Sequence, residues 1–164
     1  GCGKSTTASG IFFELKKLNY SVELINEYIK QWCYINLEPV SFDQLYIFAK
    51  QLRMEDVVLR SGTKNIVTDS PLFMQIIYAE EFSLPFTDEL LSIALKWEQK
   101  HPSLNIFLNR SLSDYQEEGR YHSLEQAIDL DNKIKNFLKQ NKIAFEEIDT
   151  RDFDSILSLV KHKV

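Results

Sequence analysis

The chain opens on residues whose order could bind phosphate. Gly1, Gly3, Lys4 and Ser5 match the second half of the pattern G-x-x-x-x-G-K-[ST]. In a loop of this kind the glycines let backbone amides close around phosphate oxygens, the lysine reaches the β- and γ-phosphates, and the serine hydroxyl ligates magnesium. The sequence therefore predicts a site for ATP and Mg²⁺. Its candidate residues are Gly1, Cys2, Gly3, Lys4, Ser5 and Thr6. A glycine-rich turn before an ordinary helix is the competing interpretation.

The same pattern makes a prediction about the start of the chain. Its first glycine is expected three positions before Gly1. The loop also normally follows the central strand of a sheet, and no residues before Gly1 supply that strand. We therefore expect the chain to begin inside its own phosphate loop, with the first, central strand missing, and to fold and bind ATP poorly by itself.

Two acidic residues follow segments that are typical of strands. Asp69 comes after the β-rich run 65–68, where an enzyme with a phosphate loop places an acid that holds magnesium directly or through water. It could instead begin a simple turn of sequence Asp-Ser-Pro. Glu27 ends the expected strand 21–27 and could accept a proton from an attacking hydroxyl. A solvated glutamate at the end of a strand is the alternative for Glu27.

A polar loop carries an arginine at each end. Arg110 and Arg120 flank it, between the expected strand 104–109 and the next helix. Arginine stabilises the negative charge that develops on a transferred phosphoryl group, so the loop is interpreted as a mobile lid, with Gly119 allowing Arg120 to swing. Because the loop also contains acidic side chains, ordinary surface ion pairs are the alternative.

Three residues are candidates for binding the acceptor. Gln51 could pair with the edge of a base, and Arg53 could meet a phosphate or a carboxylate. Tyr28 belongs to an aromatic-rich segment that could stack on a base or a nicotinamide ring. Solvated helix residues and core aromatics are the alternatives.

The elements that must position these residues alternate along the chain. Apolar periodicity and turn residues predict strands at 21–27, 65–69, 104–109 and 144–149. They predict helices at 4–18, 41–62, 72–82, 87–100 and 123–141. This order predicts an α/β fold of three layers, a parallel sheet flanked by helices, with ligands at the carboxyl ends of the strands. No linker or repeat divides the chain, so a single domain over 1–164 is expected.

Several helix ends carry capping signals. Ser41 and Gln44 have the spacing of a capping box, and so do Ser123 and Gln126. Thr87 is expected to cap the helix 87–100. The first helix is expected to end near Asn19, a residue that tolerates the left-handed conformation.

Composition narrows the class of protein. The chain has 164 residues, 44% of them hydrophobic, and a formal net charge of −5, so it has no globally basic surface for nucleic acid or anionic membranes. Cys2 and Cys33 are too few for a disulfide framework, and no apolar run approaches the ~20 residues of a membrane span. The three histidines lack metal-binding spacing. We expect a cytoplasmic protein without a transition metal; its oligomeric state is left open.

The motifs occur in an order that is similar to a known family. The chain contains Gly-Cys-Gly-Lys-Ser-Thr, Asn26-Glu27-Tyr28, Gln51-Leu-Arg53, Val67-Thr-Asp69 and Gly119-Arg120. In this order they resemble the P-loop kinase-like ATPases of phages and bacteria, as far as about residue 150. Ribosylnicotinamide kinase domains, and phage kinases that act on nucleotides or modified DNA bases, are similar in outline. Deoxynucleoside kinases are more distant.

The resemblance implies an ATP- and Mg²⁺-dependent transfer of the γ-phosphoryl group to a hydroxyl or phosphate acceptor. By that resemblance Glu27 matches the acid near the acceptor hydroxyl, Asp69 the acid associated with magnesium, and Arg120 the lid arginine, while Asp149 and Thr150 adjoin the adenine. A nucleoside or nucleotide is the expected acceptor, and DNA carrying modified bases is a second possibility.

One position departs from the family pattern. Many such kinases have an arginine immediately after the acid, whereas this chain has Ser70. The departure favours a nucleoside-like or unusual acceptor over one that carries a phosphate. A P-loop ATPase that acts as a switch or assembly factor without a phosphorylated substrate is the alternative function, and a domain that binds nucleotide without turnover is a third.

Overall fold

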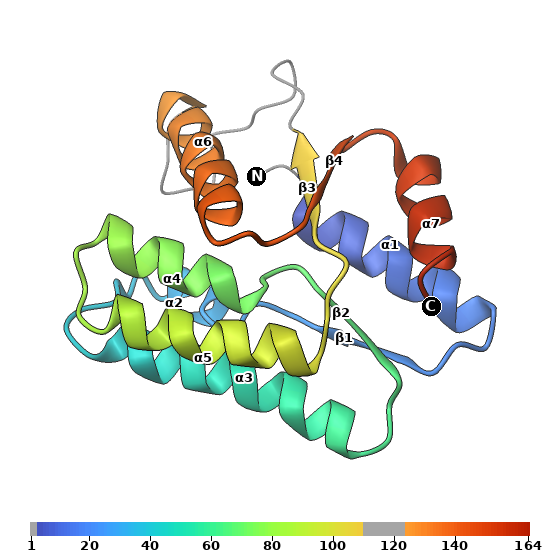
Figure 1. The fold of residues 1–164 in the computed structure, drawn as a ribbon, viewed down its shortest axis with the longest axis horizontal. Coiled ribbons are helices and arrows are strands. Elements are labelled where there is room, and N and C mark those ends of the chain that lie inside the picture. Colours follow the sequence, from blue (N-terminus) through green and yellow to red (C-terminus); the bar gives the residue numbers. More distant parts are fainter. Residues whose placement is uncertain (1–2, 110–123) are drawn as a thin grey trace. The chain divides into compact units, whose positions relative to one another are not determined.

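The computed structural model describes residues 3–109 and 124–164. It divides the chain into two compact units. The terminal unit comprises Gly1–Thr7 and Leu104–Val164, and the middle unit comprises Ala8–Ser103. Each unit is described by itself below (Figure 1).

Helices and strands alternate as the sequence predicts. In chain order they are α1 (Lys4–Lys17), β1 (Val22–Ile25), α2 (Lys30–Tyr34), α3 (Asp43–Arg60), β2 (Asn65–Thr68), α4 (Leu72–Glu81), α5 (Thr87–Lys100), β3 (Ile106–Asn109), α6 (Leu124–Gln140), β4 (Glu146–Asp149) and α7 (Phe153–Lys161). All the predicted elements are present, with ends that differ by up to two residues. The short helices α2 and α7 were not predicted.

The described strands pair in parallel, which confirms the expected α/β class. In the middle unit β1 pairs with β2, with Val22 opposite Asn65 and Ile25 opposite Thr68. In the terminal unit β3 pairs with β4 in the same sense. Within the described ranges these are two sheets of two strands each. Parallel pairing places the carboxyl ends of both members of a pair at the same edge.

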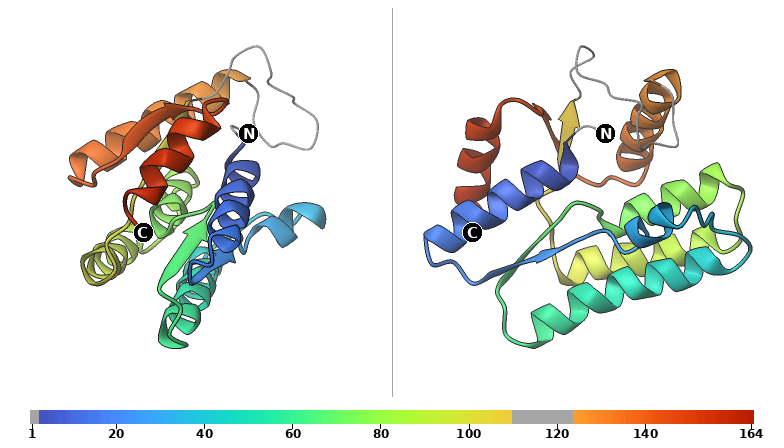
Figure 2. Two further views of the ribbon diagram at one scale, coloured as in Figure 1. Left: turned by 90° about the vertical axis from the view of Figure 1, so that its right-hand side faces the viewer. Right: turned by 180° about the vertical axis from the view of Figure 1, so that it is seen from behind.

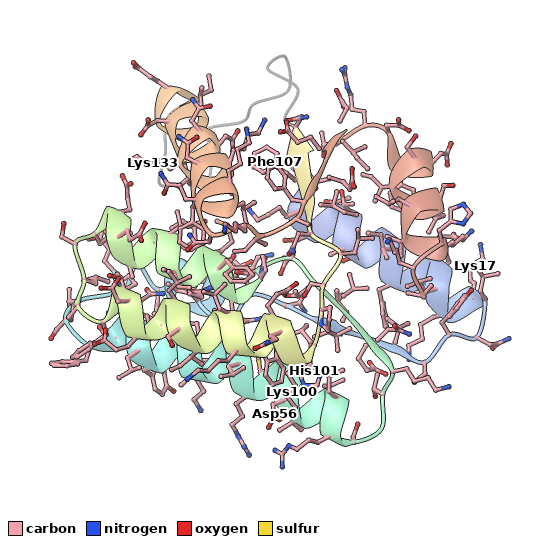
Figure 3. The ribbon with its side chains drawn as sticks, in the orientation of Figure 1. Lys17, Asp56, Lys100, His101, Phe107 and Lys133 are labelled. Atoms are coloured by element: carbon pink, nitrogen blue, oxygen red, sulfur yellow. The ribbon has the colours of Figure 1, made fainter. Side chains whose placement is uncertain are left out.

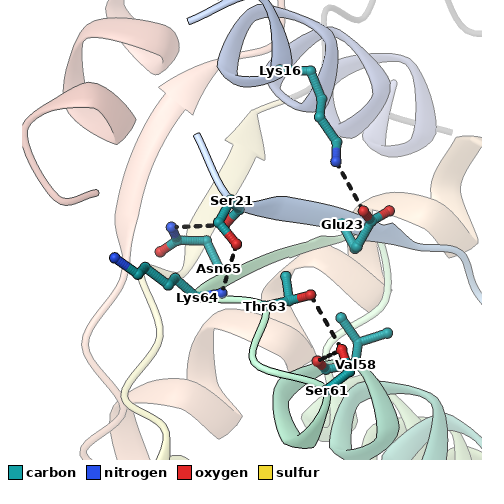
Figure 4. Close-up of polar contacts among 8 residues, drawn as sticks. All are labelled: Lys16, Ser21, Glu23, Val58, Ser61, Thr63, Lys64 and Asn65. Carbon is teal, nitrogen blue, oxygen red and sulfur yellow. Dashed lines mark hydrogen bonds and ion pairs between the residues drawn. The ribbon is translucent and has the colours of Figure 1, made fainter. Parts of the chain in front are cut away.

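Polar contacts fix the opposite, amino-terminal edge of the pair β1–β2 (Figure 4). The backbone amide and the side-chain amide of Asn65 both donate to the carbonyl of Ser21, at 3.1 and 3.2 Å. The backbone amide of Lys64 donates to Ser21 Oγ at 3.2 Å, and Lys16 Nζ lies 2.9 Å from Glu23 Oε1. Because these bonds lock the start of β2 to the start of β1, they set the register that carries through to the other edge.

Helix α4 forms the centre of the middle unit. Its buried apolar residues are Leu72, Phe73, Met74, Ile76, Ile77 and Ala79. A helix that is apolar on all sides must be covered on all sides, and α4 packs against both α3 and α5 (Figure 1). Helix α3 also contacts both strands of the pair β1–β2 (Figure 2). The acidic residues that follow β1 and β2 are therefore held by strands that pack against an apolar core.

The terminal unit has a smaller core of its own. Its buried apolar side chains come from β3, α6 and α7 and include Phe107, Leu108, Phe137, Leu138, Ile156 and Val160. Asp152 caps α7 by accepting a hydrogen bond from the backbone amide of Ser155 at 3.1 Å. Lys135 of α6 lies over the Phe107 ring and bonds Asn109 and Glu147, and the Lys135 hydrogen bond holds the pKa of Glu147 below its usual value.

Charged side chains on the outer faces of helices make local pairs. Lys17 Nζ lies 3.1 Å from Glu14 Oε1, and Arg60 Nε lies 2.8 Å from Asp56 Oδ2; Lys17 and Asp56 are labelled in Figure 3. Exposed pairs of this kind contribute about 0.5 kcal/mol or less each, so the apolar cores carry most of the stability. No helix in the described part of the chain has the length and apolar character needed to cross a membrane.

The helix ends correct two capping predictions. The capping box at Ser41 and Gln44 is wrong: Phe42 occupies the N-cap of α3 and makes no side-chain cap bond, while the Gln44 side chain is buried. Its amide bonds α4 instead, because a buried partner outweighs a solvent-exposed cap. Asn19 has the expected left-handed conformation, with φ of 60°.

Helix α5 begins at Thr87 as predicted, but Phe86 occupies its N-cap. The capping box predicted at Ser123 begins outside the described residues.

Candidate active site

Gly3 lies where the loop becomes a helix. Helix α1 begins at the next residue, and its first bond runs from the Thr7 amide to the Gly3 carbonyl at 2.9 Å. Gly3 has φ of +76°, and a Cβ atom placed on it would lie 2.9 Å from Thr150 Oγ1. Both the left-handed backbone and the close approach require glycine here. The structure thus places Thr150, which follows β4, against the loop glycine.

The start of α1 suits an anion. Lys4 and Ser5 form its first turn, which contains no acidic residue. The first amides of a helix lack partners within the helix and carry partial positive charge, so phosphate oxygens bind well at such an end. Lys4 and Ser5 are both half-buried. Gly1 and Cys2 lie outside the described residues.

Asp149 is engaged locally. Its carboxylate accepts from the backbone amide of Arg151 at 2.8 Å and from the Arg151 guanidinium at 3.3 and 3.4 Å. These hydrogen bonds hold the pKa of Asp149 below its usual value. Of the two residues predicted beside the adenine, Thr150 therefore lies at the phosphate loop, while the carboxylate of Asp149 closes a turn with Arg151.

The structure brings the two predicted acids together in the middle unit. Glu27 follows β1 and Asp69 follows β2, and both strands end at the same edge. The backbone amide of Glu27 donates to Asp69 Oδ1 at 3.0 Å, and the Ser70 hydroxyl donates to Glu27 Oε1 at 3.2 Å. Asp69 and Ser70 are buried and Glu27 is half-buried. The result is a fixed pair of carboxylates at the edge where parallel sheets bind ligands.

Buried amides continue this cluster into the core. Gln75 Nε2 donates to Ser70 Oγ at 3.2 Å, and Gln44 Nε2 donates to Gln75 Oε1 at 3.0 Å. Sequence reasoning did not place these three residues beside Glu27: Gln44 was expected to cap a helix, Ser70 was noted as a departure from the family pattern, and Gln75 was not considered. Gln75 offered a signal, because a lone amide inside the apolar run of α4 must find partners when it is buried.

The candidate acceptor residues separate into a joined pair and an outlier. The backbone amide of Tyr28 donates to Gln51 Oε1 at 3.1 Å. Gln51 is fully buried, whereas Arg53, two residues further along α3, is exposed. Residues two apart on a helix point to different faces. The structure therefore joins Tyr28 to Gln51 and leaves Arg53 on the outer surface of α3.

Aromatic rings gather beside Tyr28. Its ring lies edge-on to Tyr46 with centroids 5.8 Å apart, and Trp32 lies 6.5 Å from Tyr46. The Tyr28 hydroxyl donates to the Tyr46 hydroxyl at 3.0 Å. This bond raises the pKa of Tyr28, the donor, and lowers the pKa of Tyr46, the acceptor. The half-buried Tyr28 thus presents an aromatic face with a fixed hydroxyl.

Glu55 is an ionisable group inside the same unit. Burial raises the pKa of Glu55 to about 7. The hydrogen bond from Trp97 Nε1 at 3.0 Å lowers this pKa, and Gln51 lowers it by a smaller amount. The negative charge of Glu98 raises it slightly. Within the described ranges, Gln51 Nε2 and Glu55 Oε1 are the buried side-chain atoms that lack a hydrogen bond of ordinary geometry. Glu55 is therefore partly protonated near neutral pH.

Two of the predicted residues, one in each unit, carry oxygens of the kind that magnesium prefers. No cluster of three or more histidine, cysteine, aspartate or glutamate side chains in the described part of the chain could hold a metal ion. Magnesium in phosphate sites needs no such cage, since it keeps waters and takes one or two protein oxygens plus phosphate oxygens. Ser5 and Asp69 each offer an oxygen of the right kind. Arg110 and Arg120, the predicted lid arginines, lie outside the described residues.

Comparison with known proteins gives a family and a fold. A family model described as an AAA domain matches residues 1–155. Among solved structures, the chain is similar to deoxyadenosine kinase from M. mycoides, determined with the products dCMP and a flexible dCDP bound. The sequence identity is 24% and the TM-score 0.55, and the match covers 99% of this chain and 93% of the kinase chain. No curated protein matches the sequence closely. The structural likeness establishes the α/β fold predicted from the sequence.

Proposed function

This chain belongs to the AAA domain family of P-loop proteins, and from that membership we propose that it is an ATP- and Mg²⁺-dependent phosphotransferase of the nucleoside or nucleotide kinase type. The observation that carries the proposal is the cluster at the shared edge of β1 and β2. There Glu27 is bonded through its backbone to Asp69 and through its side chain to Ser70. A kinase needs such a fixed carboxylate beside its acceptor hydroxyl, whereas a nucleotide switch does not.

On the ATP side, the loop and the start of α1 bind the phosphates. Lys4 meets the β- and γ-phosphates, and the Ser5 hydroxyl and the Asp69 carboxylate hold Mg²⁺. When bound, the ion neutralises charge on the phosphate oxygens. Gly3 keeps the loop backbone close enough to the phosphates, and Thr150 lies beside it.

On the acceptor side, Glu27 orients the hydroxyl and takes its proton. The hydroxyl oxygen forms a bond to the γ-phosphorus as the bond from that phosphorus to the bridging oxygen of ADP breaks. The proton passes to Glu27 and then to solvent, and ADP leaves. Lys4 and the arginines Arg110 and Arg120 meet the charge that develops on the transferred group.

A nucleoside or nucleotide is the proposed acceptor. Tyr28 offers an aromatic face for a base, and Gln51 holds the Tyr28 backbone in place. Ser70 is uncharged and already bonds Glu27, which favours an acceptor without a phosphate at that position. The likeness to deoxyadenosine kinase supports the same substrate class. Nicotinamide riboside and DNA carrying a modified base are tested in the same experiment. Arg53 is a candidate surface contact for a phosphate of the acceptor.

The test follows the labelled phosphoryl group. The protein is incubated with Mg²⁺ and γ-labelled ATP, and with separate panels of nucleosides, nucleotides, nicotinamide riboside and modified-base DNA. Label on one class of acceptor, lost in Lys4→Ala, supports the proposal. Label that appears only as free phosphate with every acceptor would overturn it and favour an ATPase that acts as a switch or assembly factor.

A further inference from the structure

A backbone carbonyl fixes the direction of a buried hydrogen-bond chain. Gln44 Nε2 lies 2.8 Å from the carbonyl oxygen of Gln75, and a carbonyl oxygen can only accept. The nitrogen of the Gln44 amide, and not its oxygen, must therefore face α4. The same nitrogen lies 3.0 Å from the side-chain amide of Gln75. Since nitrogen faces it, that amide must present its oxygen to Gln44.

The direction then passes along the chain to Glu27. With its oxygen toward Gln44, the Gln75 amide turns its nitrogen toward Ser70 Oγ at 3.2 Å. Ser70 accepts this bond and has one hydroxyl proton left to give. That proton points to Glu27 Oε1 at 3.2 Å. Every donor in the chain is thus aimed the same way, and the chain ends on a carboxylate oxygen.

Burial makes this direction persistent. Gln44, Ser70 and Gln75 are at most 1% exposed, so water does not compete for their bonds. Their neighbours on α4 are apolar on all sides, including Phe73 and Ile76. Apolar groups of the same shape would stabilise such a core about as well, so stability alone does not account for three linked polar side chains. A role in holding Glu27, at which their hydrogen bonds end, does account for them.

We infer that Gln44, Gln75 and Ser70 are positioning residues, which hold the Glu27 carboxylate in one orientation for the acceptor hydroxyl. The inference rests on the proposed function, in which Glu27 acts on that hydroxyl. The backbone of Glu27 is held separately by Asp69 Oδ1, so the residue is fixed at both its amide and its side chain. The series of hydrogen bonds therefore controls the orientation of the carboxylate, and none of its three side chains is assigned to the phosphates of ATP or to Mg²⁺.

The first test separates turnover from nucleotide binding. Ser70→Ala removes the last donor of the chain, and we expect kcat for acceptor phosphorylation to fall about tenfold or more, because a hydrogen bond to a charged group is lost. KM for ATP should stay within about twofold. Gln75→Met keeps the shape of the side chain but frees the Ser70 hydroxyl to rotate, so it should lower kcat by a smaller factor in the same direction.

A matched control lies in the same turn. Thr68 Oγ1 accepts a hydrogen bond from the backbone amide of Ser70 at 3.2 Å, and Thr68 is not a member of the series of hydrogen bonds that ends at Glu27. Thr68→Val should leave kcat within about twofold. An equal loss in Thr68→Val and Ser70→Ala would show that the turn matters only as structure, and would overturn the inference.

A double-mutant cycle gives the deciding result. If Ser70 acts through Glu27, Ser70→Ala should have little further effect, within about twofold, once Glu27→Gln has been made. Independent, multiplying losses would overturn the inference while the proposed function stands. If the wild-type protein phosphorylates no acceptor, the proposed function fails first and the inference falls with it.

Discussion

Gly3 is required both by its backbone conformation and by a close neighbouring side chain. Its φ of +76° is a conformation that other residues adopt at a cost of about 1 kcal/mol, and its missing side chain leaves room for Thr150. Gly62 provides a comparison within the same chain, because its φ of +95° is equally unfavourable but no atom lies within 4 Å of the place where a Cβ would be. Comparing substitutions at Gly3 and Gly62 therefore distinguishes the effect of backbone strain from the effect of crowding at the phosphate loop.

We expect Gly3→Ala to weaken ATP binding about tenfold or more, because the new methyl group pushes the loop away from Thr150. Gly62→Ala should lower the melting temperature but leave ATP affinity unchanged. Isothermal titration calorimetry with Mg²⁺ and ATP measures the first effect, and thermal unfolding measures the second. Thr150→Ala combined with Gly3→Ala should restore part of the affinity; unchanged affinity in Gly3→Ala would contradict the crowding argument.

Glu27 carries a second prediction at this scale. Glu27→Gln keeps the shape of the side chain and removes the proton acceptor, so we expect kcat for acceptor phosphorylation to fall about 100-fold. ATP affinity should be unchanged. Glu23→Gln is the control, since Glu23 lies on β1 at the surface and pairs with Lys16. Steady-state kinetics of both variants tests this prediction. A normal kcat for Glu27→Gln would show that Glu27 is not the proton acceptor.

At the scale of elements, the sequence predicts those whose pattern is local. The helix 87–100 was predicted with both its ends because turn residues flank a periodic segment. Helix α2 was missed because five residues give too little periodicity, and the capping box at Ser41 failed because Gln44 had a buried partner on α4. That partner lies 31 positions away in the chain, and single-sequence patterns contain no such information.

Among the candidate residues, too, those whose position depends on local sequence could be predicted and those that depend on distant packing could not. Glu27 and Asp69 could be predicted because each follows its own strand, and parallel pairing then brings their ends together. Ser70 and Gln75 could not be assigned, since their place beside Glu27 depends on how α4 packs. Gln51 and Arg53 were grouped by closeness in sequence, yet the turn of α3 separates a buried residue from an exposed one.

The contact between α3 and α5 makes the stability of the protein depend on pH. Glu55 is bonded to Trp97 across these helices, and burial raises its pKa from 4.5 to about 7. The folded state therefore binds a proton more tightly than the unfolded chain does. The stability from this group is fully present below about pH 4.5 and is lost as the pH rises through about 7.

We expect Glu55→Gln to abolish this slope, because the amide does not titrate. Relative to its value at pH 5, the free energy of unfolding of the wild type should fall by about 2 kcal/mol by pH 8, while that of Glu55→Gln changes much less. Urea unfolding at several pH values measures the difference. Glu38→Gln, at an exposed position, should keep the wild-type slope. Parallel slopes for the wild type and Glu55→Gln would contradict the assignment.

At the scale of the whole molecule, most of the proposed roles divide between the two units, although Asp69, which is assigned to Mg²⁺, belongs to the middle unit. The described residues assigned to the phosphates of ATP, Gly3, Lys4 and Ser5, belong to the terminal unit, as does Thr150. The residues assigned to the acceptor, Glu27 and its neighbours Tyr28 and Gln51, belong to the middle unit. Each ligand should therefore leave its own pattern of protection on the backbone amides.

Hydrogen exchange measured by mass spectrometry tests this division. A non-hydrolysable ATP analogue with Mg²⁺ should slow exchange most at the start of α1 and after β4, because bound phosphates order those amides. The class of acceptor that the protein phosphorylates, added without ATP, should slow exchange most at residues 26–28. Lys4→Ala should lose the first pattern and retain the second. If the acceptor alone protected the start of α1 and left residues 26–28 unchanged, the assignment of the acceptor to the middle unit would be wrong, whatever the kinetics of Glu27→Gln had shown.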